Sequence, residues 1–210
     1  MCGMTTGRPA GYSAISNYSR VEILHLLQEQ PRRTVAELVE ATDLHANTVR
    51  EHLQRLIDDG YVVSATEHRT TRGRPRVLYS ATDGVSSQSA VQHRRVRAAA
   101  ERGDLMRRVL PGDTPALDTD ALHQIDALVE DLIDAGFDPL IDERELTVEL
   151  TPCAQASVQA EHREVLCRVH LGIMQSVLSA ADGPLAVDGM RPSCDPRECV
   201  VQLLHIPQPA

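Results

Sequence analysis

The five cysteines are the residues with the most evident chemistry, and four of them fall within the last 58 positions. The gaps between these four are 13, 26 and 4 residues. Four thiolates form the complete ligand set of a [2Fe–2S] or [4Fe–4S] cluster, or of a tetrahedral Zn²⁺ ion, and soft thiolates select these metals over Mg²⁺ and Ca²⁺. We therefore predict a metal or cluster site formed by Cys153, Cys167, Cys194 and Cys199. A thiol redox switch and unrelated buried cysteines remain the alternatives.

His170 follows Cys167 by one helical turn in a segment with helical character, so its imidazole is an alternative fourth ligand to Cys194. The other interpretation is a structural histidine that donates to a backbone carbonyl or to a cluster sulfur. Met174, one turn further, is expected in the core, and Cys2 in the polar leader is expected to play no part. A cysteine nucleophile with His170 as its base would be an enzyme, but no oxyanion loop or third partner can be recognised. We therefore expect no catalytic activity.

A second set of residues has the chemistry of DNA recognition. Near the start of a helix expected from about His45, the outward side chains can bond base edges and phosphates in the major groove. A basic segment over 68–76 can reach the DNA backbone or the minor groove. The predicted contacts with double-stranded DNA are Asn47, Thr48, Arg50, Glu51, Arg55, Arg72, Arg74 and Arg76. A protein-interaction module with an arginine-rich face is the alternative interpretation.

Charge is divided unevenly along the chain. Residues 1–110 contain 16 Arg against 12 Asp and Glu, whereas residues 111–210 contain 5 Arg against 18 acidic residues, and Lys is absent. Only the first half is therefore suited to approach a polyanion. No apolar run is long enough to span a bilayer or to act as a signal peptide, so we expect a cytoplasmic protein in a reducing compartment, without membrane association.

The elements that position the DNA-contacting residues follow a helix-turn-helix order over residues 19–82. Capping boxes at 19–22 and 34–37 predict the starts of two helices, and a third helix runs from about His45 to a stop at Gly60. Strand-like runs at 61–66 and 77–81 enclose the basic segment. Three helices followed by a basic hairpin predict a winged helix-turn-helix.

The remaining elements place the cysteines. After a polar leader over 1–18 and the winged domain, residues 83–117 read as a helical connector, interrupted near Gly103. Either this connector or the helix expected at 121–135 serves as the dimerisation element, and an intramolecular strut is the alternative role of the connector. Residues 118–210 read as helix (118–135), strand (146–150), helix (159–180) and two strands (185–187 and 200–206). The predicted fold class is α+β, with an N-terminal winged helix-turn-helix and a C-terminal α+β cysteine domain.

Two stretches resemble the DeoR/ArsR-like helix-turn-helix regulators that include the SufR-type repressors of iron–sulfur cluster assembly operons. The first is LHANTVREHLQRLIDDGYV with the wing GRPRVLYS, and the second is TPCAQASVQAEHREVLCRVHLGIMQ with RECVVQLLHIP. The resemblance covers most of residues 19–206 and is weakest at 83–120. It implies cluster ligation by Cys153, Cys167 and Cys199. Cys194 does not stand where the family's remaining cysteine is expected, and Ala154 replaces a frequent proline, so the fourth ligand and the cluster type stay open.

Together these features predict a homodimeric, winged helix-turn-helix transcription regulator. Its DNA affinity would be controlled by an iron–sulfur cluster that the C-terminal cysteines bind, which would make it a redox sensor. The alternative is the same regulator with a zinc site or a thiol-redox site in place of the cluster.

Overall fold

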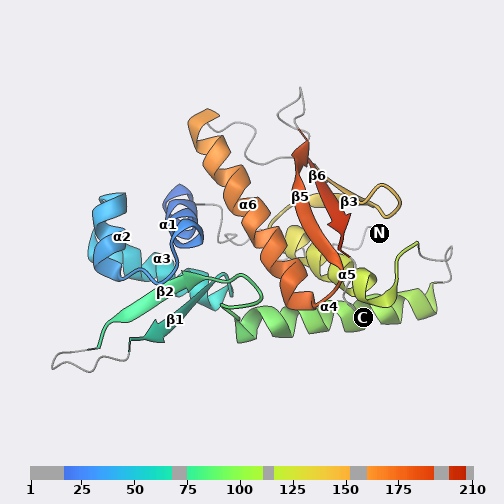
Figure 1. The fold of residues 1–210 in the computed structure, drawn as a ribbon, viewed down its shortest axis with the longest axis horizontal. Helices are drawn as coiled ribbons and strands as arrows, with labels where there is room; N and C mark the ends of the chain where they lie inside the picture. The colour runs from blue at the N-terminus through green and yellow to red at the C-terminus, as the bar shows by residue number, and fades with distance from the viewer. Residues whose placement is uncertain (1–16, 68–74, 111–115, 152–159, 192–198, 207–210) are drawn as a thin grey trace, which may run out of the picture.

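The computed structural model describes residues 17–67, 75–110, 116–151, 160–191 and 199–206. The described part is an α+β fold, in which a helical N-terminal region with a two-stranded wing precedes a domain with a four-stranded sheet (Figure 1). The predicted fold class is therefore confirmed. None of the helices in these ranges is long and apolar enough to cross a membrane.

Three helices open the fold: α1 (Tyr18–Glu29), α2 (Val35–Thr42) and α3 (Ala46–Asp58). The predicted capping box at the start of α2 is confirmed, because Glu37 N–H donates to Thr34 Oγ1 at 3.3 Å and Thr34 N–H donates to Glu37 Oε2 at 2.6 Å. The predicted box at Ser19 is wrong. Asn17 caps α1 instead, its side-chain oxygen accepting from the next N–H groups, since an amide oxygen two residues earlier satisfies the same orphan donors.

The wing consists of β1 (Val62–Thr66) and β2 (Val77–Ala81), which pair antiparallel from Val62 opposite Ala81 to Thr66 opposite Val77. Arg33, between α1 and α2, adds an isolated bridge to the free edge of β2, where Arg33 and Tyr79 exchange backbone hydrogen bonds of 2.8–3.0 Å. A single-residue bridge leaves no periodicity in the sequence, so this contact was not predicted.

Helix α4 (Ala90–Val109) runs without a break through Gly103, which corrects the predicted interruption there. A Cβ at Gly103 would collide with the Asp126 side chain on α5 (Thr119–Asp134). The glycine therefore allows two helices to approach closely. In a long helix packed along its length, tertiary contacts override the weak helix propensity of one glycine.

The C-terminal sheet contains β3 (Asp138–Asp142), β4 (Thr147–Thr151), β5 (Leu185–Arg191) and β6 (Cys199–His205) in the order β3-β4-β6-β5, with every pairing antiparallel. Strand β3 was not predicted, because Pro139 and flanking acidic residues obscure its alternation. It lies at the sheet edge, where proline is tolerated. Helix α6 (Ala160–Ala181) packs against β5.

Helix α6 also joins the two halves, because it contacts α1, α4 and α5 (Figure 1). Gln28 on α1 donates through Nε2 to the Val169 carbonyl at 3.3 Å, and buried Gln92 on α4 donates to Ser176 Oγ at 2.9 Å. Buried side chains from α1 to β6 form one continuous hydrophobic cluster. Helix α1 of the N-terminal region is thus packed directly on α6, the helix that carries Cys167.

Candidate functional site

Helix α3 has one buried face and one exposed face. Val49, Leu53 and Leu56 are at most 1% exposed and anchor the helix to the core. The opposite side presents the predicted contacts: the exposed side chains are Asn47, Arg50, Glu51 and Arg55, and Thr48 is half-buried. Helical geometry therefore places all five predicted residues where a duplex can reach them, Thr48 less fully than the others.

The start of α3 is ordered by local hydrogen bonds. The His45 side chain caps the helix by accepting from the Asn47 N–H through Nδ1 at 3.3 Å, and Arg50 donates to Asn47 Oδ1 at 3.0 Å. A preformed Asn47–Arg50 pair presents donors and an acceptor together, which suits the recognition of base edges. On the neighbouring helix α1, burial lowers the pKa of Arg20, and the positive charge of Arg55 on α3 lowers it further.

The wing contributes one described arginine. Arg76 is exposed immediately before β2, and its carbonyl accepts from the Glu67 N–H at 2.8 Å. Arg72 and Arg74 lie outside the described residues. Sequence reasoning did not assign Arg32 and Arg33, which lie beside β2 through the Arg33–Tyr79 bridge and a hydrogen bond of 3.0 Å from Arg32 N–H to Ser80 Oγ. Two adjacent arginines after the first helix were the only available sequence signal.

Two of the predicted ligands open onto one small pocket. Cys167 on α6 and Cys199, the first residue of β6, both line a cavity of about 30 Å³ together with His170 and Met190. The Cys199 thiol donates to Met190 Sδ at 3.3 Å. The tertiary structure therefore places at one cavity two cysteines that are 32 positions apart in the sequence.

His170 lies in the same pocket, stacked on Phe137 with ring centroids 4.7 Å apart. Burial lowers the pKa of His170 to about 4, so the ring is neutral at physiological pH. Its Nε2 atom is buried and has no hydrogen-bond partner among the described residues. The predicted donation to a backbone carbonyl is not seen from that nitrogen, whereas a neutral imidazole is the form that binds metals.

Cys153 and Cys194, like Cys2, lie outside the described residues. Within the described ranges no group of three or more His, Cys, Asp and Glu side chains has the geometry of a metal site. Met174 is fully buried, as predicted. The described residues thus contribute two thiols and one imidazole to a common pocket, without a complete ligand set.

Comparison with known protein families shows that residues 17–64 match the family described as "Bacterial regulatory protein, arsR family". No match was found among curated proteins or among solved structures. The matched range comprises α1, α2, α3 and the start of β1, the elements that carry the exposed recognition face. Residues 17–64 are therefore a helix-turn-helix domain of the arsR family, and the chain that contains them is a DNA-binding transcriptional regulator.

Proposed function

We propose that this regulator changes its DNA affinity according to whether an iron–sulfur cluster is bound by its C-terminal cysteines. The observation that supports the proposal is the shared pocket: Cys167 and Cys199 come from different elements and line one cavity, beside a buried imidazole nitrogen that has no hydrogen-bond partner in the described part of the chain. Soft thiolates with an adjacent neutral imidazole are donors that fit iron–sulfur clusters or zinc.

The other two cysteines are close along the chain to described residues. Leu150 of β4 pairs with Cys199, and Cys153 follows Leu150 by three residues. Three residues of chain span at most about 11 Å. Cys194 precedes Cys199 by five residues. Cys153, Cys167, Cys194 and Cys199 would hold the cluster, with His170 as the alternative to Cys194. The cluster would supply a redox-sensitive set of metal–thiolate bonds.

The chain's own residues would convert ligation into a change in DNA binding. Ligands on α6, at the start of β6 and just beyond β4 would hold these three elements together, and α6 packs on α1 of the DNA-binding domain. Loss of the ligation would loosen that arrangement. A reversal of occupancy from 99:1 to 1:99 requires about 5.5 kcal/mol of preference for one state, which several metal–thiolate bonds can provide.

We further propose that the regulator is a homodimer joined through the end of α4. Leu105, Met106 and Val109 are 52–63% exposed there and form an apolar stripe. A second copy of α4 packed on this stripe about a two-fold axis would cover the same three apolar side chains on both subunits. Dimerisation would present two recognition helices to two half-sites.

Anaerobic purification tests the cluster proposal. We expect a brown protein with absorption in the visible range and with iron and acid-labile sulfide, and we expect Cys167→Ser to remove the colour and change DNA affinity. Cys2→Ser is the matched control and should retain both properties. A colourless protein without iron, or a Cys167→Ser variant with unchanged iron content and DNA affinity, would refute the proposal.

A zinc site is the second candidate, and the small size of the pocket favours it. A cavity of about 30 Å³ holds little more than one water or one ion, and Cys₃His is a common zinc ligand set. Stoichiometric zinc in a colourless protein would establish this alternative in place of the cluster.

A further inference from the structure

The turn Asp59–Gly60–Tyr61 connects the recognition helix α3 to the wing strand β1. Gly60 N–H donates to the Ile57 carbonyl at 3.0 Å and Tyr61 N–H donates to the Leu56 carbonyl at 2.9 Å, which is the hydrogen-bond pattern of a Schellman motif. Gly60 has φ +85°, which only glycine adopts without strain. Backbone hydrogen bonds therefore connect Gly60 and Tyr61 to the last turn of α3, so contacts made by these residues affect the position of that helix.

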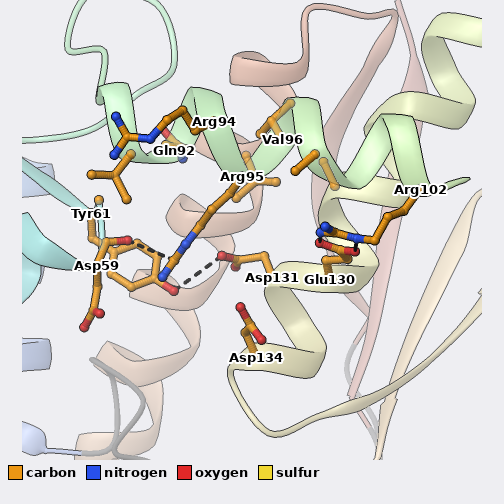
Figure 2. Close-up of a pocket in the computed structure, with 15 residues that line it drawn as sticks. Asp59, Tyr61, Gln92, Arg94, Arg95, Val96, Arg102, Glu130, Asp131 and Asp134 are labelled. Carbon is orange, nitrogen blue, oxygen red and sulfur yellow. Dashed lines mark hydrogen bonds and ion pairs between the residues drawn. The ribbon is translucent and has the colours of Figure 1, made fainter.

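Helices α4 and α5 contact this turn at two points. Arg95 on α4 donates through Nη1 to the Asp59 carbonyl at 3.0 Å, and the Tyr61 hydroxyl donates to Asp131 Oδ1 on α5 at 3.4 Å. Figure 2 shows the Arg95 side chain reaching from α4 to the space between Asp59, Tyr61 and Asp131. These residues line a cavity of about 310 Å³ between the two halves.

The exit of the wing is fastened to the same turn. Thr82, the residue after β2, is 6% exposed and donates through its backbone N–H to the Tyr61 carbonyl at 3.0 Å. Its hydroxyl donates to the carbonyls of Gly60 and Tyr61 at 3.3 Å. Recognition helix, wing, α4 and α5 thus meet at three residues, and the orientation of both DNA-contacting elements depends on contacts made there.

We propose that Tyr61, Arg95 and Asp131 are positioning residues for DNA binding, which act by holding the exit turn of α3 against α4 and α5. None of them has to touch the duplex. The proposal requires the DNA-binding activity of the N-terminal domain and does not require the cluster. It assigns a role to α4 and α5 even in metal-free protein, because these two helices would set the orientation at which α3 is presented.

The test compares DNA affinity of full-length variants by fluorescence anisotropy, with a labelled duplex selected from random-sequence DNA by the wild-type chain. We expect Arg95→Ala to weaken binding about tenfold, the equivalent of one hydrogen bond to a charged donor. Arg94→Ala is the matched control, because it removes the same charge from an exposed neighbour on α4. Arg95→Lys, which can still donate to the Asp59 carbonyl, should recover part of the affinity.

Two further measurements separate positioning from a general loss of structure. Stoichiometric titration should give the same active fraction for Arg95→Ala and wild type, and hydrogen exchange should accelerate at the Gly60 and Tyr61 amides while the α1 amides stay protected. If Arg95→Ala does not fold, Tyr61→Phe decides, since it removes only one hydroxyl and should weaken binding about two- to fivefold. Iron content measured in parallel shows whether a change in affinity follows cluster loss instead.

Equal affinities for Arg95→Ala and Arg94→Ala would overturn the proposal. If Arg95→Ala does not fold, a Tyr61→Phe variant that binds DNA with wild-type affinity would overturn the proposal as well. Weakened binding of Arg95→Ala with partial recovery in Arg95→Lys would support it, whatever metal the cysteines hold.

Discussion

Replacing Asp131 by Asn should stabilise the protein at neutral pH. Burial in the cavity raises the pKa of Asp131 from 3.8 to about 6, an effect that the Arg95 guanidinium and the Tyr61 hydroxyl only partly oppose and that Asp134 on the same helix reinforces. Each pH unit corresponds to about 1.4 kcal/mol, so the ionised carboxylate costs at most about 3 kcal/mol of unfolding free energy at pH 7.5. Asparagine keeps the Oδ1 acceptor for Tyr61 and carries no charge.

The sign of the pH dependence follows from the direction of the shift. Because the folded pKa lies above the unfolded value, the folded state holds the proton more tightly between pH 4 and 6. The contribution of Asp131 to stability is therefore fully present below about pH 4 and is lost as the pH rises through about 6. The Asp131→Asn variant lacks this loss, so its advantage over wild type should grow across that window and vanish near pH 4.

Urea unfolding followed by far-ultraviolet circular dichroism, at pH 4.5 and at pH 7.5, measures the difference. Asp134→Asn is the control for loss of a carboxylate from the same helix, because Asp134 is exposed and is the last of the causes that raise the pKa of Asp131. Its effect should be much smaller than that of Asp131→Asn and within about 0.5 kcal/mol. The reasoning fails if Asp131→Asn is no more stable than wild type at pH 7.5, or if both lose stability equally between the two pH values.

Four other outcomes are expected. Thr34→Ala removes one side of the α2 capping box and should lower the unfolding free energy by about 0.5–2 kcal/mol in denaturant titrations; no change would mean that the box does not stabilise α2. Gly103→Leu should destabilise the α4–α5 contact by more than 1 kcal/mol, because its side chain would meet Asp126, and a neutral result would place the two helices further apart. Arg76→Ala should weaken DNA binding and reduce the slope of log affinity against log salt by about 0.9 if Arg76 contacts a phosphate; an unchanged slope excludes that contact. Leu105→Glu should convert a dimer to a monomer in light scattering, and a variant that still dimerises would move the interface away from α4.

Short-range signals in the sequence predicted most of the DNA-binding domain. The capping box at Thr34 and the glycine stop at Gly60 were confirmed by hydrogen bonds within a few residues of each, and the bounds of β2 were predicted residue for residue. These features depend on local backbone geometry, so neighbouring residues carry enough information. Two residues near the start of α1, Asn17 and Ser19, are both suitable helix caps. The sequence pattern predicted Ser19, whereas Asn17 is the cap in the structure.

Contacts between distant residues could not be predicted in the same way. In the sequence, Gly103 indicates a helix break. In the structure, its missing side chain leaves room for the Asp126 side chain of α5, so the glycine is a point of close contact between two helices. Likewise, the sequence predicted that the cysteines form a site but offered no reason to expect Phe137 against His170 or Met190 against Cys199.

Residue types and local spacing thus determined that residues 19–82 contain a helix-turn-helix and that thiols are the donors available to a soft metal. Only the tertiary structure showed that Arg95 on α4 and Asp131 on α5 form hydrogen bonds with the turn that follows α3. It also showed that Cys167 and Cys199 line one pocket with the buried imidazole of His170. The physical reason is that helix caps, turns and amphipathic stripes are encoded within about ten residues, whereas burial and desolvation depend on which distant surfaces pack together.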